Sequence, residues 1–288
     1  MAESPSHRFG QVVGNLLEEI LKPELLRFCD ERGLYLDRHG SRINVRKGRK
    51  VAWEDKYGNS HDLDFVIEKD GSDDARGRPV AFIEAAWRRY TKHSRAKAQE
   101  IQGAVLPIAE TYALEAPFLG AVLAGIFTAP SLDQLRSLNF NIVYLPYDSI
   151  VDAFAGVGID ARFDEQTPDA AFRTCVDRIG ILAAADREKV KRAILDANAA
   201  QFDDFFVKLR RKLDRTTRRV TVLPLFGTAM TFGSATEAGA FIGAFDPATA
   251  AGEFRKYEVS IVFSNGDEVR GMFADQAEAN RFLRYVTS

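Results

Sequence analysis

Two adjacent segments each place an acidic residue inside a short apolar run of the length of a β-strand. They are residues 61–67 and 79–86, separated by a polar stretch, 70–78, that is rich in Gly, Asp and Ser. Side chains alternate between the two faces of a strand. Asp64 and Glu84 therefore each share a strand face with an apolar residue two positions away. The pattern predicts a hairpin with one carboxylate on each strand.

The register of this hairpin brings the two acids together. If position 69 faces position 79, counting back along the ladder places Asp64 opposite Glu84. Directly opposed side chains have Cβ atoms about 5 Å apart. Two carboxylates this close on an apolar face repel each other and are costly to desolvate unless a cation lies between them. The sequence therefore predicts a site for a divalent metal ion.

An acid on one strand, followed by a second strand that ends in Glu-x-Lys, is the motif of the PD-(D/E)xK nucleases. Residues 10–155 resemble that family, with Asp64 as the first acid and Glu84 as the second. The resemblance implies an α/β protein with a three-layer α/β/α restriction-endonuclease-like core. It also implies Mg²⁺ held by the two carboxylates and the carbonyl of Ala85. One departure is Ala86, which stands where the family has lysine.

The family is known to move this lysine to the following helix, so the next segment is informative. Residues 94–112 carry apolar side chains at 101, 105, 108 and 112, the spacing of one helical face. Lys97 is four residues before Ile101 and lies on that face, where lysine is rare without a partner. We predict that Lys97 is the relocated catalytic lysine, although it can also extend from the first turn to solvent. The rival basic residues are Arg88, Lys92 and Arg95.

Three further side chains are candidates for supporting roles at this site. Glu19 lies on an amphipathic helix over 9–21, Asp62 shares the face of Asp64, and Gln99 is in the helix of Lys97. Each has a simpler interpretation as a solvent-facing polar residue.

Basic residues are concentrated on both sides of the acidic strands, although the formal net charge of the chain is only −2. A single charged run is usually a solvated surface. Two runs that flank a predicted metal site favour a polyanionic substrate, since Lys and Arg bind phosphates. We therefore predict a double-stranded DNA partner, contacted by Arg46, Lys47, Arg88, Arg89, Lys92 and Arg95.

The remaining pattern is that of a buried α/β core. Residues 118–127 and 141–147 are continuous apolar runs typical of central strands. The predicted order α, β, β, β, α, β, α, β agrees with the nuclease core. The chain has neither GxGxxG after a first strand nor GxxxxGK[ST], so no nucleotide cofactor is predicted.

Three regions are expected along the chain: a nuclease core over 1–163, a helical linker region over 164–217 and a small α+β domain over 218–288. The last region contains an apparent ββα repeat, because residues 232–242 align with 273–283 at an offset of 41. Each copy has an N-cap residue followed by Glu at the third helical position. Chance similarity of two capping boxes is the alternative.

Composition and the resemblance together define the functional hypothesis. No apolar run reaches about 18 residues and no signal-peptide pattern begins the chain, so we expect a cytoplasmic protein without membrane spans. The resemblance implies a Mg²⁺-dependent endonuclease that hydrolyses DNA phosphodiester bonds, foremost a homodimeric type II restriction enzyme. A repair or mobile-element nuclease would share these features. The alternative is a catalytically inactive DNA-binding protein that keeps the nuclease fold.

Overall fold

The computed structural model describes residues 4–91, 94–225, 229–249 and 254–288. The chain divides into two compact units. The first comprises Met1–Thr111 and Pro117–Lys208, and the second comprises Tyr112–Ala116 and Leu209–Ser288.

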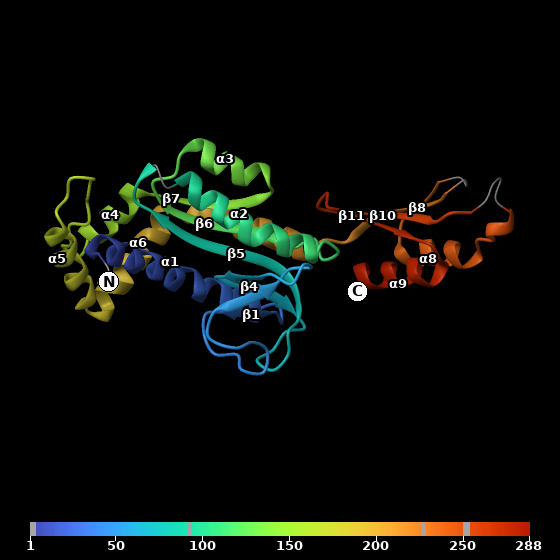
Figure 1. Cartoon of the computed structure of the whole chain (residues 1–288), viewed down its shortest axis with the longest axis horizontal. Helices are drawn as coiled ribbons and strands as arrows, with labels where there is room; N and C mark the ends of the chain where they lie inside the picture. The colour runs from blue at the N-terminus through green and yellow to red at the C-terminus, as the bar shows by residue number, and fades with distance from the viewer. Residues whose placement is uncertain (1–3, 92–93, 226–228, 250–253) are drawn as a thin grey trace. The chain divides into compact units, whose positions relative to one another are not determined.

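The first unit is built on a five-stranded mixed sheet with the strand order β1-β4-β5-β6-β7 (Figure 1). The pairs β1–β4 and β4–β5 are antiparallel, whereas β5–β6 and β6–β7 are parallel. Every residue of β6 is buried, which explains its uninterrupted apolar sequence. The strands are β1 (Tyr35–Arg38), β4 (Phe65–Lys69), β5 (Arg78–Arg88), β6 (Phe118–Gly125) and β7 (Phe140–Pro146).

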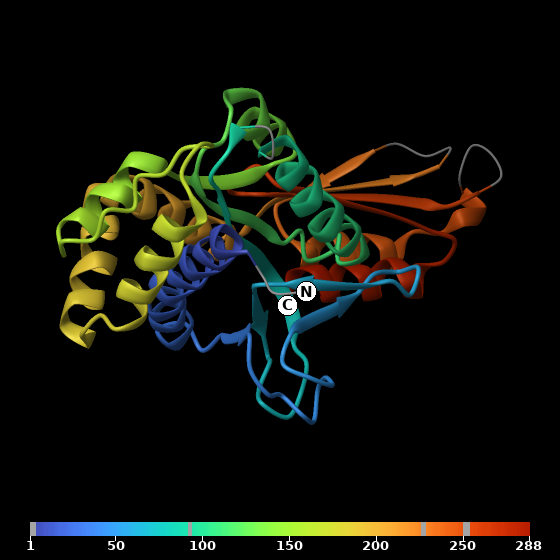
Figure 2. The same cartoon turned by 60° about the vertical axis from the view of Figure 1, so that its left-hand side comes forward.

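Helices cover both faces of this sheet, as Figures 1 and 2 show, and the α/β class is confirmed. On one face, Trp87 of β5 contacts Phe9 of α1 and stacks on Tyr147 of α4. On the other face, Arg88 contacts Glu100 of α2. The helices are α1 (Pro5–Asp30), α2 (Ser94–Thr111), α3 (Ala129–Ser137), α4 (Tyr147–Ala155), α5 (Asp169–Gly180), α6 (Ala184–Ala197) and α7 (Ala199–Leu213).

Two details of the first unit differ from the pattern-based expectation. Helix α1 continues through Pro23, because its apolar face is buried on both sides of the proline and the packing outweighs one lost backbone hydrogen bond. The segment 164–217, expected to be a helical linker, forms α5, α6 and α7, and these belong to the first unit up to Lys208.

A separate two-stranded hairpin precedes β4. It consists of β2 (Val51–Glu54) and β3 (Ser60–Leu63). The expected single strand over 61–67 is thus divided at Asp64, which occupies a bend between β3 and β4. This division lets one stretch of chain pair with two different partners.

The second unit is a four-stranded antiparallel sheet in the order β11-β10-β8-β9 with helices α8 and α9. Its strands and helices follow as two ββα units, as the repeat predicts. Ser234 and Asp275 are the N-caps, and each accepts a hydrogen bond from the backbone N–H of the Glu three residues later. The elements are β8 (Thr217–Pro224), β9 (Met230–Phe232), α8 (Ala235–Ala244), the 3₁₀ helix η2 (Pro247–Thr249), β10 (Tyr257–Phe263), β11 (Glu268–Phe273) and α9 (Gln276–Thr287).

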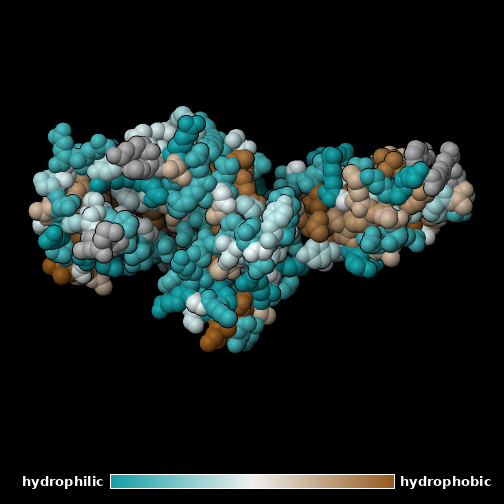
Figure 3. All heavy atoms as spheres, viewed as in Figure 1, coloured by the Kyte–Doolittle hydropathy of each residue, from teal (hydrophilic) through white to brown (hydrophobic). Residues whose placement is uncertain are grey.

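Figure 3 shows a largely hydrophilic surface on which apolar residues form small separate patches. Among the described residues, none of the helices combines the length and the apolar character needed to cross a bilayer.

A buried ion-pair network holds the loops beside β1 and β4. Arg42 lies 2.6 Å from Glu68 and 3.1 Å from Asp37, and all three side chains are at most 1% exposed. Arg46 pairs with Asp37 at 3.0 Å and donates to the carbonyls of Gly40, Gly48 and Arg38. The side chains of this network join β1 and β4 to the loops beside them, where the backbone forms no regular hydrogen-bond ladder.

Replacing Arg42 with Met should lower the free energy of unfolding by about 3–5 kcal/mol, because Glu68 would remain buried without its cation while Asp37 would keep only Arg46. Lys50→Met is the matched control, since Lys50 pairs with Asp62 at 2.6 Å while 74% exposed. That change should leave stability nearly unaltered. Urea denaturation measures both, and equal losses would contradict the assigned role of the network.

Candidate metal centre

The structure places Asp64, at the bend just before β4, beside Glu84 of β5. The predicted register is confirmed where Phe65 pairs with Ile83 and Ile67 with Ala81; beyond Ile67 a bulge shifts the pairing by one residue. The backbone N–H of Asp64 donates to Glu84 Oε1 at 3.3 Å. The backbone N–H of Ala85 donates in turn to Asp64 Oδ2 at 2.7 Å. Each acid is therefore held by the strand of the other.

Both carboxylates are costly to ionise. Burial raises the pKa of Asp64. Burial also holds the pKa of Glu84 well above its usual range, and the charge of Asp64 raises it further. Glu84 is only 7% exposed. A divalent cation that binds the ionised pair would relieve both effects.

Lys97 is brought to this pair by the first turn of α2. Its side chain is 17% exposed, and its Nζ lies 2.6 Å from a carboxylate oxygen of Glu100. The charge of Lys97 lowers the pKa of both Asp64 and Glu84, whereas the charge of Glu100 raises both. Ala86, at the position of the lysine in the resembling family, is buried in the core of the sheet.

The candidate supporting residues lie outside this group. Asp62 is paired with Lys50 at 2.6 Å. Glu19 lies 3.6 Å from Arg187 and 3.9 Å from Lys191, among helices α1 and α6. Gln99 is exposed on α2.

A glutamate not selected from the sequence, Glu18, lies nearer to the site. It is half-buried, and its pKa is raised by burial and by the charge of Asp64. A signal was present in the sequence: Leu21, Leu25 and Phe28 follow Glu18 at intervals of three, seven and ten residues, the spacing of one helical face.

The residues predicted to contact DNA differ in accessibility. Lys47 and Arg95 are exposed, and Arg88 is partly exposed and lies 3.4 Å from Glu100. The guanidinium of Arg89 packs on the rings of Tyr90 and Phe172 at 4.2 and 4.1 Å.

The last two residues predicted to contact DNA are Arg46 and Lys92. Arg46 is buried and all its donor groups are engaged by Asp37 and three carbonyls, so its role in this conformation is structural. Lys92 lies outside the described residues.

The donor set agrees with a hard divalent cation. Carboxylate and carbonyl oxygens are the ligands that Mg²⁺ prefers, and Mg²⁺ often binds through only one or two carboxylates while keeping several waters. Asp64, Glu84 and the carbonyl of Ala85 supply such oxygens. In the part of the chain that the structure describes, no three Asp, Glu, His or Cys side chains form a larger metal cluster.

Fold and site define an α/β protein in which partly buried Asp64 and buried Glu84 lie side by side where β4 begins to pair with β5. Comparisons of the chain with protein families, with curated proteins and with solved structures find no match.

Glu84→Gln should raise the unfolding temperature at pH 8 in metal-free buffer. A raised pKa means that the folded protein loses stability as pH rises above the pKa of an unfolded glutamate, about 4.3. The amide keeps the acceptor for the Asp64 N–H but carries no charge, so its advantage over Glu should vanish near pH 4. Calorimetry in EDTA measures the difference, with Glu19→Gln as the control. A variant less stable than wild type at pH 8 would show that the Glu84 charge is already compensated.

Proposed function

We propose that this protein is a Mg²⁺-dependent DNA endonuclease of the PD-(D/E)xK type that hydrolyses phosphodiester bonds. The observation that carries the proposal is the pair of partly buried Asp64 and buried Glu84, in which each carboxylate accepts a hydrogen bond from a backbone amide beside the other acid. Two strained carboxylates beside one ammonium suit a reaction in which negative charge develops on a phosphate.

Each residue of the site would have a role that follows from its chemistry. Asp64, Glu84 and the Ala85 carbonyl would hold Mg²⁺, which supplies neutralisation of the scissile phosphate and acidification of the attacking water. Lys97 would stabilise the charge that builds on the phosphate as water attacks and the P–O bond breaks. Lys97 Nζ pairs with Glu100 at 2.6 Å, and this ion pair would have to open before the ammonium could reach the phosphate.

Exposed basic side chains on both sides of the site would bind the DNA backbone. Lys47 lies before the first acidic strand, and Arg88 and Arg95 follow the second. Phosphate contacts of this kind supply affinity without reading sequence. A restriction role is favoured because a second compact unit accompanies the catalytic one.

The second candidate is a DNA-binding protein that has lost catalysis, and Ala86 favours it because the family lysine is missing from its usual strand. The two differ in one assay. An active enzyme cleaves plasmid DNA in Mg²⁺ and stops in EDTA, whereas a binding protein only shifts the mobility of DNA.

Asp64→Asn and Glu84→Gln should each reduce plasmid cleavage in Mg²⁺ by roughly a thousandfold or more, about 4 kcal/mol of barrier. Asp62→Asn is the matched control, because Asp62 lies two residues away but is exposed and paired with Lys50. It should cleave as the wild type does. Near-normal cleavage by the Asp64 or Glu84 variant would remove the proposed metal site.

Lys97→Ala should lower turnover by roughly two to three orders of magnitude with little change in DNA affinity, since the ammonium acts mainly in the transition state. Lys97→Arg should rescue poorly, because a planar guanidinium does not replace a compact ammonium. Lys56→Ala provides the control. Lys56 lies outside α2 but pairs at 2.6 Å with Glu110 of α2, the helix that carries Lys97. Single-turnover cleavage and a binding titration separate the two effects. Weaker binding with normal turnover would make Lys97 a phosphate anchor.

A further inference from the structure

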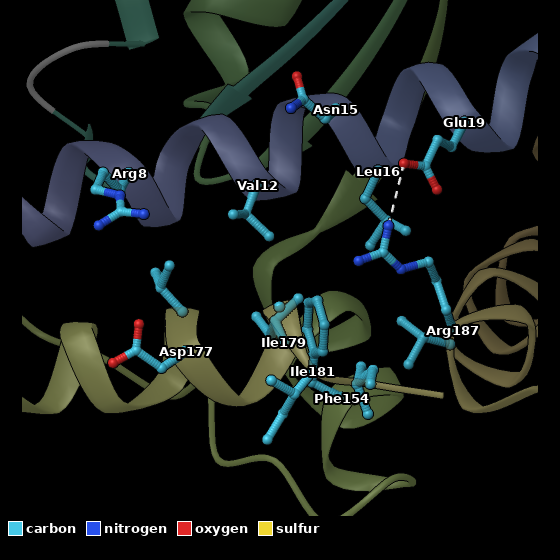
Figure 4. A pocket seen from close by; sticks show the side chains of 14 residues that line it. Arg8, Val12, Asn15, Leu16, Glu19, Phe154, Asp177, Ile179, Ile181 and Arg187 are labelled. Carbon is cyan, nitrogen blue, oxygen red and sulfur yellow. Dashed lines mark ion pairs between the residues drawn. The ribbon is translucent and has the colours of Figure 1, made fainter. Parts of the chain in front are cut away.

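A second feature of the first unit is a cavity of about 580 Å³ between α1 and the turn that joins α5 to α6 (Figure 4). Neither Asp64 nor Glu84 lines it, so the cavity is separate from the metal centre. Its volume falls within the roughly 300–1,000 Å³ of sites that bind small molecules. Apolar side chains form most of its walls, among them Leu16, Phe154, Val176, Ile179, Ile181 and Val190.

The cavity is elongated along α1. The α1 residues that line it are numbers 8, 12, 15, 16 and 19, the spacing of one stripe along a helical face. Arg8 and Glu19, at the two ends of this stripe, are eleven residues apart, about 16 Å along a helix. A ligand that fills this space must therefore have a long and mainly apolar body.

The charged groups at the Glu19 end of the cavity are already paired within the chain. Glu19 lies 3.6 Å from Arg187 and 3.9 Å from Lys191. Lys191 also pairs with Glu188 of the same helix. A charged group of a ligand would have to compete with these ion pairs, so this end does not favour one.

The Arg8 end differs, because two exposed guanidinium groups lie there. Arg8 and Asp177 line the cavity, and both also line an adjoining hollow of about 240 Å³ together with Arg173. Over residues 4–91, 94–225, 229–249 and 254–288, none of these three side chains takes part in an ion pair. Two positive charges and one negative charge leave this end with a net charge that a single carboxylate would balance.

We propose that the cavity binds an amphipathic small molecule that has a long apolar body and a carboxylate at one end. Arg8 and Arg173 bind the carboxylate, since a guanidinium matches the two oxygens of that group. The apolar body lies beneath α1, where its removal from water supplies affinity. Ile181, which is 85% exposed at the rim, gains an apolar contact when the body is bound. No residue of the metal centre takes part, so the proposal stands whether or not the chain cleaves DNA.

Isothermal titration calorimetry of the full-length protein with decanoate tests the proposal. Decanoate should bind with one-to-one stoichiometry. Acetate, which lacks the apolar body, and 1-decanol, which lacks the charge, should each bind more weakly by roughly tenfold or more. Absence of decanoate binding, or equal affinity for 1-decanol, would overturn the proposal.

Charge reversals locate the carboxylate. Arg8→Glu and Arg173→Glu should each weaken decanoate binding by roughly tenfold or more, with circular dichroism showing that the variants stay folded. Arg192→Glu is the matched control, because Arg192 is exposed on α6 and lines neither hollow. It should bind decanoate as the wild type does. Binding by both Arg8 and Arg173 variants as tight as that of the control would contradict the assigned anchor.

Filling the cavity tests the position of the apolar body. Val12 points from α1 into the cavity (Figure 4), so the larger side chain of Val12→Trp should occupy the space of the ligand and abolish decanoate binding. Unchanged affinity in this folded variant would place the ligand elsewhere and overturn the proposal.

Discussion

The structure depends on the junction at β5, the strand that pairs antiparallel with β4 and parallel with β6. At the edge of its antiparallel partner, the backbone amides of Asp64 and Ala85 each bind the carboxylate of the opposite strand. These hydrogen bonds hold two carboxyl groups beside each other at a largely buried place. Moving either carboxyl group away would break its hydrogen bond to a backbone amide. Ionisation of both acids in this arrangement is opposed by burial and by their mutual repulsion.

Two groups of buried charges in the first unit illustrate opposite uses of the same physics. In the network around Arg42, the carboxylates of Asp37 and Glu68 have guanidinium partners within 3.1 Å. Their desolvation is offset inside the protein, and the network stabilises loops. At Asp64 and Glu84 the nearby ammonium of Lys97 is shared with Glu100, and the pKa values of both acids remain raised. Compensation of charge inside the protein is therefore less complete at this pair than around Arg42.

Sequence reasoning succeeded where local periodicity and tertiary position coincide. The register expected for the two acidic segments agrees with the pairing of Phe65 with Ile83 and of Ile67 with Ala81. Sequence periodicity was less informative for charged side chains at the edge of the apolar face of a helix. Glu18 and Glu19 are adjacent on α1, and only the packing of that helix decides that Glu18 lies near Asp64 while Glu19 pairs with Arg187. Arg46 belongs to a basic run, yet it is buried because Asp37 of β1 lies beside it.

The sequence by itself determined the α/β class, the hairpin that joins the two acids and the two capped ββα units of the second unit, because each depends on contacts within a few tens of residues. Tertiary structure alone decided which helices complete the first unit and that Glu18 of α1 is influenced by the charge of Asp64 while Glu19 pairs with α6. It also decided that Ile181 is left exposed beside an apolar hollow. The physical reason is distance along the chain: residues 8, 154 and 181 come together only through packing, and the periodicity of any one segment carries no record of its distant neighbours.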